Sequence, residues 1–374
     1  MKNFIVCLMS SFLLLPPAAK DSYLIVGTYT AGKSEGIYVY KFNSMDGSFK
    51  EVSHVKASNP SYVTVSPGQR FVYAVYEDAG SNNKGGDIAA FSFDKTTGDL
   101  TFLNKQPSGG DHPCYVEIDK TGKWVVAGNY SSGSLSLLPV NTDGSLGNAV
   151  TTIQHQGSGA NKQRQEKPHV HCTVFSKDNR FLFVPDLGID KVMIYAFNDT
   201  TGKLTPALQP FAKSDDGAGP RHLTFHPSNK FAYLIEELSG TVVAYEYNDG
   251  ALNRIQRISS MPQNDSSFAG SADIHVSADG KFLYASNRSN SNTIAIYKVN
   301  KKTGKLTHVG HQSTMGKTPR NFNFDPSGNF LLVGNQESNQ VVIFRRDKKT
   351  GLLFDTEKRI EVGKPVCLKW ISIE

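Results

Sequence analysis

The chain has 374 residues with a formal net charge of +6, 39% hydrophobic residues and 20% charged residues. This is the composition of a globular protein. Because Lys and Arg are scattered through the turns rather than massed on one stretch, we exclude a nucleic-acid-binding footprint. The 33 Gly residues and 10% aromatic residues favour all-β structure.

The first segment has the pattern of a secretory signal. A short positive start precedes an apolar run over residues 4–15, and two prolines and two alanines follow it. This order predicts a signal peptide over 1–19, and the run is too short to span a bilayer comfortably. We therefore expect a periplasmic or secreted protein with no stable membrane association after cleavage. An uncleaved anchor is the alternative interpretation.

One sequence unit recurs along residues 20–374. Each unit begins with a small residue or proline, continues as an alternating strand, turns at Asp, Asn or Gly, and adds further strands. The unit starts are NPSYVTV (59–65), HPCYVEI (112–118), PHVHCTV (168–174), GPRHLTF (219–225), GSADIHV (270–276), TPRNFNF (318–324) and KPVCLKWI (364–371). Their spacing of roughly 50 residues is typical of propeller blades.

A second set of strands counts the blades. It comprises GIYVYKFN (36–43), DIAAFSFD (87–94), SLSLLPV (134–140), KVMIYAFN (191–198), TVVAYEY (241–247), TIAIYKV (293–299) and QVVIFRR (340–346). Four of these precede a T-G hairpin, as in TTGDL at 96–100. Seven such strands predict an all-β, seven-bladed β-propeller.

The two ends of the repeat predict how the ring closes. Strands 23–30 and 36–43 lack an inner strand of their own, whereas 364–371 is an inner strand with nothing after it. Together they predict one blade completed from both ends of the chain, which removes exposed sheet edges. A closed ring without free edges also leads us to expect a monomer.

Polar residues that break the apolar pattern identify a candidate site. In a propeller, the unit starts and the ends of the second strands converge around one end of the central channel. The residues concerned are Tyr62, Glu77, His112, Tyr115, Asn129, His169, His171, Asp186, Arg221, His222, Glu236, Glu237, Asp273, Arg288, Arg320, Asn321, Asn335 and Gln336. Imidazole, carboxylate and several guanidiniums suit an anionic substrate and one proton transfer.

Each of these residues also has a purely structural interpretation. His169 and His171 have a metal-ligand spacing, but no convincing third ligand accompanies them, so we predict neither a metal nor another cofactor. Either histidine could bind a loop instead. The arginines could form salt bridges between blades, and Glu237 could pair with one of them. Outside the signal, Cys114, Cys172 and Cys367 show no C-x-x-C spacing, which favours buried packing.

Short motifs in blade order carry a family resemblance. They are G-T-Y-T (27–30), N-P-S-Y (59–62), H-P-C-Y (112–115), P-H-V-H (168–171), G-P-R-H (219–222), E-E-L (236–238), S-N-R (286–288) and P-R-N-F (319–322). With them, nearly everything after residue 22 resembles the seven-bladed lactonase propellers. That family includes bacterial 6-phosphogluconolactonase and the fungal carboxymuconate cycloisomerases.

The resemblance implies roles for particular residues. The cycloisomerase branch implies a catalytic set that falls on His171, Arg221, Glu237 and Arg288. We add His169, Asp186, His222, Arg320 and Asn335 as expected substrate-binding residues. The implied reaction is hydrolysis of a small-molecule sugar δ-lactone that carries an anionic group. In it His171 is the general base, Arg221 or Arg288 stabilises the oxyanion, Arg320 holds a phosphate or carboxylate, and Glu237 orients an arginine or assists the leaving oxygen.

The predicted export signal bears on the substrate. A sugar phosphate made inside the cell would rarely reach an exported enzyme, so an unphosphorylated aldonolactone or another exported lactone is the alternative to 6-phosphogluconolactone. Two other classes of function stay open. A cycloisomerase of a carboxylated lactone would use the same four residues. A non-catalytic propeller that binds glycans or proteins would instead show aromatic patches at the channel mouth.

Overall fold

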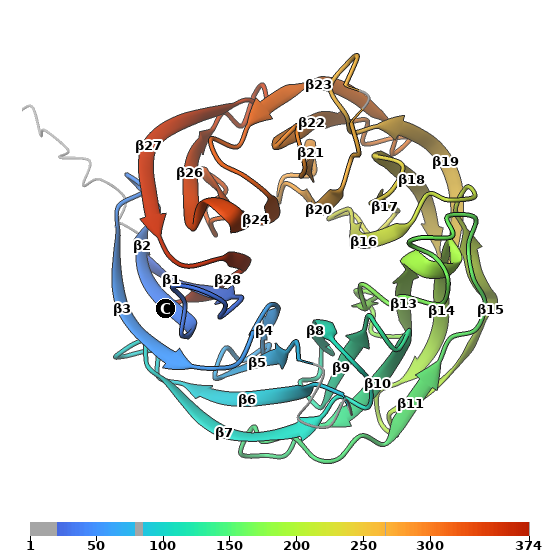
Figure 1. The fold of residues 1–374 in the computed structure, drawn as a ribbon, viewed down its shortest axis with the longest axis horizontal. Coiled ribbons are helices and arrows are strands. Elements are labelled where there is room, and N and C mark those ends of the chain that lie inside the picture. The colour runs from blue at the N-terminus through green and yellow to red at the C-terminus, as the bar shows by residue number, and fades with distance from the viewer. Residues whose placement is uncertain (1–20, 79–84, 266, 374) are drawn as a thin grey trace, which may run out of the picture.

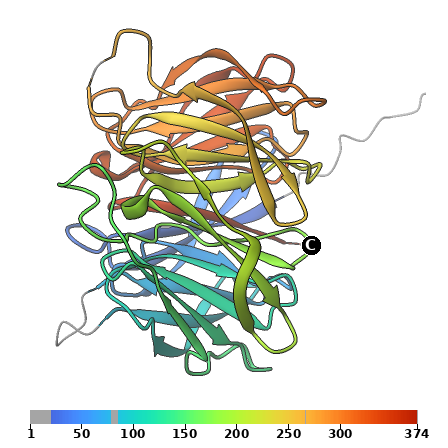
Figure 2. The same ribbon diagram turned by 90° about the vertical axis from the view of Figure 1, so that its right-hand side faces the viewer.

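The computed structural model describes residues 21–78, 85–265 and 267–373, so the predicted signal peptide lies outside the described residues. These residues form 28 strands in seven four-stranded antiparallel sheets. The sheets stand around a common centre like the blades of a propeller (Figure 1), and Figure 2 shows the same ring from its side. The predicted seven-bladed β-propeller is confirmed. No helix among the described residues is long and apolar enough to cross a membrane.

Six blades use four consecutive strands, ordered from the centre of the ring outward. They are β4 (Val63–Val65), β5 (Phe71–Tyr76), β6 (Asp87–Phe93) and β7 (Leu100–Pro107); β8 (Pro113–Ile118), β9 (Trp124–Asn129), β10 (Ser134–Pro139) and β11 (Thr151–Gln154); β12 (Val174–Phe175), β13 (Phe181–Asp186), β14 (Lys191–Asn198) and β15 (Lys203–Lys213); β16 (Pro220–Phe225), β17 (Phe231–Glu236), β18 (Thr241–Asn248) and β19 (Ala251–Ser259); β20 (Ser271–Val276), β21 (Phe282–Asn287), β22 (Thr293–Val299) and β23 (Leu306–Ser313); β24 (Pro319–Phe324), β25 (Phe330–Asn335), β26 (Gln340–Arg346) and β27 (Leu353–Glu361). Two short 3₁₀ helices, η1 (Leu187–Ile189) and η2 (Gln336–Ser338), follow second strands.

The closing blade draws on both ends of the chain, as predicted. Its strands are β28 (Pro365–Ser372), β1 (Asp21–Thr28), β2 (Gly36–Asn43) and β3 (Phe49–Lys56). β28 pairs with β1 in an antiparallel register that runs from Ser22 opposite Ser372 to Gly27 opposite Cys367. A Cβ atom at Gly27 would lie 2.5 Å from the carbonyl oxygen of Pro60 in the next blade. Only glycine permits this close approach of two backbones.

The hydrophobic core lies between neighbouring blades. Phe282 and Tyr284 of β21, for example, pack with Phe322 and Phe344 of the following blade. The outer T-G hairpins extend this contact from one blade to the next. Gly202 has a φ of +70°, and a Cβ there would meet the ring of Trp124 at 2.4 Å. Backbone conformation and the neighbouring ring therefore both require glycine at this turn.

Two inner strands are shorter than the sequence pattern predicts. β4 has 3 residues and β12 has 2, and His171 lies just before β12 rather than within it. Just before β12, Oδ1 of Asp186 accepts hydrogen bonds from the backbone N–H groups of His169 and Gly188, at 2.7 and 2.9 Å. Only an isolated bridge between Val170 and Asp186 remains in this segment.

Candidate active site

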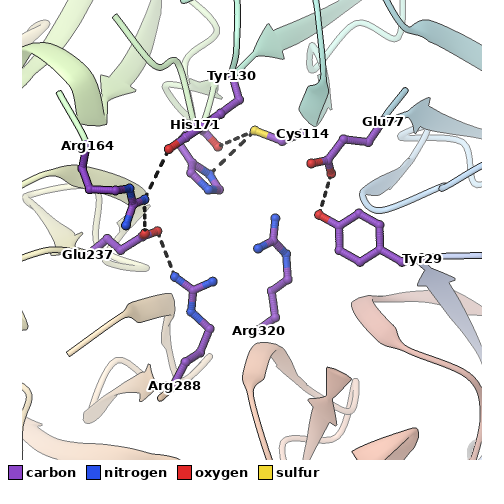
Figure 3. Close-up of a pocket in the computed structure, with 9 residues that line it drawn as sticks. All are labelled: Tyr29, Glu77, Cys114, Tyr130, Arg164, His171, Glu237, Arg288 and Arg320. Atoms are coloured by element: carbon purple, nitrogen blue, oxygen red, sulfur yellow. Dashed lines mark hydrogen bonds and ion pairs between the residues drawn. The ribbon is translucent and has the colours of Figure 1, made fainter. Parts of the chain in front are cut away.

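A cavity of about 200 Å³ opens at one end of the ring centre (Figure 3). Its walls come from residues at or near the starts of inner strands, residues that follow second strands, and one long loop. The lining residues are Tyr29, Glu77, Cys114, Tyr130, Arg164, His171, Glu237, Arg288 and Arg320. Four residues that the sequence predicts as catalytic or substrate-binding therefore meet here: His171, Glu237, Arg288 and Arg320.

Glu237 binds three guanidinium groups. Its Oε1 accepts from Nη2 of Arg164 at 2.8 Å, and its Oε2 accepts from Nε of Arg221 at 2.9 Å and pairs with Nη2 of Arg288 at 3.0 Å. Burial alone would raise the pKa of this carboxyl, but Arg288, Arg221 and Arg164 together lower the pKa to about 2. Glu237 is therefore ionised throughout the neutral range and cannot donate a proton there.

Arg164 belongs to the loop between β11 and Val170. The side chain of Gln165 anchors this loop: it is fully buried and donates to the carbonyl oxygen of Leu187 at 2.8 Å and to Oδ1 of Asp190 at 2.7 Å. The adjacent guanidinium of Arg164 is 35% exposed and reaches Glu237 from the rim of the cavity. The loop thus adds the Arg164 cation to the rim of the cavity, a charge that the repeating unit does not supply.

Arg320 points into the middle of the cavity (Figure 3). Across the described ranges its guanidinium makes no hydrogen bond and no ion pair. It makes a cation–π contact with the ring of Tyr29, whose centroid is 5.4 Å away. Tyr29 donates to Oε2 of Glu77 at 2.9 Å. Burial lowers the pKa of Arg320, but nearby Tyr29 and Glu77 raise it above its ordinary value. Arg320 is therefore a permanent cation without a bound counter-ion.

His171 is the only imidazole among the lining residues. Its Nδ1 lies 3.8 Å from Sγ of Cys114, and that thiol also contacts the carbonyl oxygen of Val170 at 3.7 Å. If the Cys114 thiol donates to the Val170 carbonyl, the Cys114 sulfur can accept a hydrogen bond from Nδ1–H of His171. Nε2 of His171 then keeps its lone pair free to accept a proton. Burial, followed by the charges of Arg221 and His222, lowers the pKa of His171 well below its ordinary value. The ring is therefore neutral at neutral pH.

The other predicted residues lie outside this cavity. Arg221 is buried behind Glu237, and Nη1 of Arg221 contacts Nε2 of His222 at 3.2 Å. The ring of His169 stacks on Tyr130 with centroids 4.5 Å apart, and Nδ1 of His169 bonds the carbonyl oxygen of Tyr130 at 3.0 Å. Oδ2 of Asp186 pairs with Nδ1 of His155 at 2.7 Å.

Asn335 has a position that recurs in other blades. It ends a second strand, and its Nδ2 donates to the carbonyl oxygen of Thr314 at 2.8 Å. Asn129 and Asn287 end the equivalent strands and donate in the same way to Ser108 and Ser260. The three asparagines tie each second strand to the segment that precedes its blade, a contact that does not face the cavity.

Four lining residues were not predicted from the sequence. Tyr29 and Cys114 stand in the G-T-Y-T and H-P-C-Y motifs, which was an available signal, and Tyr130 directly follows the end of β9. Arg164 had no signal because its loop has no counterpart in the other units. Within the described residues, no group of three His, Cys, Asp or Glu side chains is placed to hold a metal ion. Cys114, Cys172 and Cys367 are free and buried.

Fold and site together define a seven-bladed β-propeller with an arginine-rich cavity built beside one neutral histidine. A family model described as lactonase, 7-bladed β-propeller, matches residues 23–370. The chain belongs to this family.

Relatives and solved structures agree over nearly the whole chain. A 6-phosphogluconolactonase of Bacillus subtilis is 40% identical over 350 residues, 92% of this chain and 97% of the relative. A 6-phosphogluconolactonase of Formosa agariphila is 41% identical over 353 residues, 93% and 99% of the two chains. The structure of the Pseudomonas aeruginosa periplasmic gluconolactonase PpgL has a TM-score of 0.90 and 38% identity, and the match covers 95% of this chain and 100% of that one.

Proposed function

We propose that this protein hydrolyses a sugar δ-lactone in the cavity around His171. One observation carries the proposal: a neutral imidazole shares a small cavity with Arg320, a guanidinium that has no counter-ion among the described residues. Lactone hydrolysis needs a proton acceptor for the attacking water and a cation for the oxyanion that develops. The relatives named 6-phosphogluconolactonase and gluconolactonase support the same chemistry.

The proposed reaction uses one proton acceptor. Nε2 of His171 takes a proton from water as the water oxygen bonds to the lactone carbonyl carbon. Arg320 stabilises the negative charge that forms on the carbonyl oxygen. It can do so without first breaking an ion pair with a described residue. When the intermediate collapses, the ring C–O bond breaks and the leaving oxygen takes the proton held by His171. The product is an open-chain hydroxy acid, which ionises and releases one proton to solvent.

The remaining charges position the substrate. Glu237 stays ionised, so it holds Arg288 and Arg164 in place instead of transferring a proton. Arg288 and Arg164 can then donate to lactone hydroxyls or to a phosphate group, since their planar guanidiniums present several donors in fixed directions. Arg221 supports this arrangement from behind Glu237.

We propose export and an unphosphorylated aldonolactone as the physiological substrate. The signal-like pattern of residues 1–19 supports export, and one of the similar structures is a periplasmic gluconolactonase. An anion arises in every lactone hydrolysis, first as the oxyanion and then as the carboxylate product. Arg320 therefore has a role even when the substrate itself is neutral.

Acid release measured by pH-stat tests the proposal. The purified protein is given gluconolactone and 6-phosphogluconolactone in parallel, with and without a chelator, beside a His171→Ala variant. We expect release that the chelator does not change and that falls about 10²–10⁴-fold in the variant. No release above the spontaneous rate on either lactone would overturn hydrolysis of these sugar lactones. Turnover unchanged in His171→Ala would remove His171 from the mechanism.

A further inference from the structure

A chain of buried polar side chains leads away from Glu237 through the inner strands. Nε of Arg221 donates to Oε2 of Glu237 at 2.9 Å, and Nη1 of Arg221 lies 3.2 Å from Nε2 of His222. Nδ1 of His222 lies 2.8 Å from Oδ1 of Asp273. All four side chains are buried, with Arg221 on β16 only 1% exposed. The chain therefore connects the cavity wall to β20 through direct contacts between side chains.

The donors and acceptors in this chain fit in one way only. Arginine has donors alone, and an ionised carboxylate has acceptors alone. Burial lowers the pKa of His222 to about 4, so at neutral pH the ring has one N–H. That hydrogen must lie on Nδ1, which faces the Asp273 carboxylate, and Nε2 then accepts from Arg221. Asp273 thus sets the tautomer of His222, and His222 gives Nη1 of Arg221 a second acceptor beside the carbonyl oxygen of Ala272.

Asp273 is itself held from several strands. Its Oδ2 accepts from Nε2 of His275 at 3.0 Å, from the backbone N–H of Phe322 at 3.2 Å and from the side-chain amide of Asn321. Asn321 in turn accepts from the backbone N–H of Leu368 at 2.8 Å. Inner strands β16, β20, β24 and β28 are all tied to this carboxylate or its partner. The far end of the chain is therefore a rigid anchor, as positioning of a catalytic group requires.

We propose that Asp273 is a positioning residue of the active site, which acts through His222 and Arg221 to fix Glu237 and, through it, Arg288. The proposal rests on the proposed function, because it assigns this series of hydrogen-bonded side chains to the same cavity. Asp273 touches neither the cavity nor a substrate in it. Its effect on the reaction comes from the orientation of Glu237, whose Oε2 is shared by Arg221 and Arg288.

Substitutions of His222 test the chain directly. His222→Gln keeps one donor and one acceptor about as far apart as the two ring nitrogens, whereas His222→Leu keeps bulk and removes both. We expect His222→Leu to lower kcat/KM for the lactone about 10²-fold through the misplaced Glu237. The kcat/KM of His222→Gln should be about tenfold or more above that of His222→Leu. Equal activity in the two variants would overturn the proposal.

Asp273→Asn supplies a second test with its own control. Both Asp273 oxygens accept hydrogen bonds, so an amide group there must face a donor and disrupt the chain. His275→Asn is the matched control, because His275 binds the same carboxylate but lies off the path to Glu237. We expect a loss of about 10²-fold in Asp273→Asn and less than about threefold in His275→Asn. Similar losses in both would contradict a path through His222.

A spectroscopic measurement separates this inference from the proposed function. The Nε–H of Arg221 is buried and bonded to Glu237, so its ¹⁵N–¹H signal should exchange slowly with solvent. The signal should persist in the native protein, His222→Gln and His275→Asn, and shift or disappear in His222→Leu and Asp273→Asn. An unchanged signal in the last two would overturn the positioning role. If the native protein hydrolyses no lactone, the proposed function fails while this signal still decides the structural inference.

Discussion

His171 and His222 lie edge to face with their ring centroids 5.3 Å apart, and each lines a different cavity. His171 lines the cavity of Figure 3. His222 lines a second cavity of about 260 Å³ that continues toward the other ends of the inner strands. Tyr62 and Tyr115 stack at 4.0 Å beside His222, and four rings therefore separate the two cavities. This partition keeps His171 buried, and burial is the largest cause of its lowered pKa.

The pH dependence of activity should reflect that burial. A general base acts only in its neutral form, and the pKa of His171 lies well below the ordinary value of 6.5 because of desolvation and the nearby positive charge. We therefore expect kcat/KM to stay level as the pH falls from 7.5 to about 5.5, where a histidine with an ordinary pKa would lose most of its activity. Initial rates corrected for spontaneous hydrolysis measure this. An acid limb centred near pH 6.5 would show that His171 is not the base in this state.

Arg320→Gln should impair the reaction without disturbing the fold. Its guanidinium makes no hydrogen bond or ion pair in the part of the chain described, so little stability is lost. The loss of oxyanion stabilisation should lower kcat about 10²-fold or more, and inhibition by gluconate should weaken. Arg164→Gln is the control at the rim, where we expect mainly a higher KM. Equal kcat values for Arg320→Gln and the native protein would exclude Arg320 from the charged step.

Replacing Glu237 by Gln should destabilise the protein strongly at pH 7. Arg221 and Arg288 would then lack their buried counter-ion, which typically costs about 3–5 kcal/mol. The folded-state pKa of about 2 lies below the ordinary 4.5, so the carboxylate stabilises the fold above pH 4.5 and this contribution is lost as the pH falls through 2. Denaturant unfolding at pH 7 and pH 3 should show the difference from the native protein shrinking with acid. Asp215→Asn, at an exposed pair with Arg254, should cost less than about 1 kcal/mol.

The contribution of Glu117 to stability should have the opposite pH dependence to that of Glu237. It lines the second cavity, where burial raises the pKa of its carboxyl from 4.5 to about 7, and Lys369 only partly offsets this. Between these two values the folded state holds a proton that the unfolded state has lost, so stability falls as the pH rises. Glu117→Gln should therefore be more stable than the native protein at pH 8 and equally stable at pH 4. A variant less stable at pH 8 would contradict the raised pKa.

Gly202 in a T-G hairpin and Gly217 in the loop before β16 allow a matched pair of glycine substitutions. Gly202 and Gly217 both have a positive φ, of +70° and +81°. A Cβ at Gly202 would meet Trp124 at 2.4 Å, whereas a Cβ at Gly217 has no neighbour within 4 Å. Gly217→Ala should cost about 1 kcal/mol for backbone strain alone. Gly202→Ala should cost clearly more, in proportion to the displacement of the ring, and thermal unfolding of the two variants compares them.

The fold could be predicted because its signals are local and repeated. Alternating strands and turn residues recur along the chain, regularly spaced prolines begin every unit except the one with Ser271, and the closing strand at 364–371 was recognisable as the one inner strand without successors. The shortness of β4 and β12 was not predictable, because their units follow the same sequence plan as units with longer inner strands.

The candidate site was predictable only where it follows the repeat. His171 and Arg320 break the apolar pattern near unit starts, Glu237 and Arg288 break it after second strands, and all four line one cavity. Arg164 reaches that cavity from a loop without a counterpart, so no pattern indicated it. The position of Arg221 behind Glu237 also depends on side-chain direction, which the spacing of residues does not determine.

The closing blade has a consequence for biosynthesis. Its three outer strands lie within residues 21–56, and β28, which completes it, is the last strand of the propeller to leave the ribosome. Until β28 arrives, β1 has an unpaired edge and the ring stays open. A nascent chain of this design therefore cannot lock into its final shape during translation.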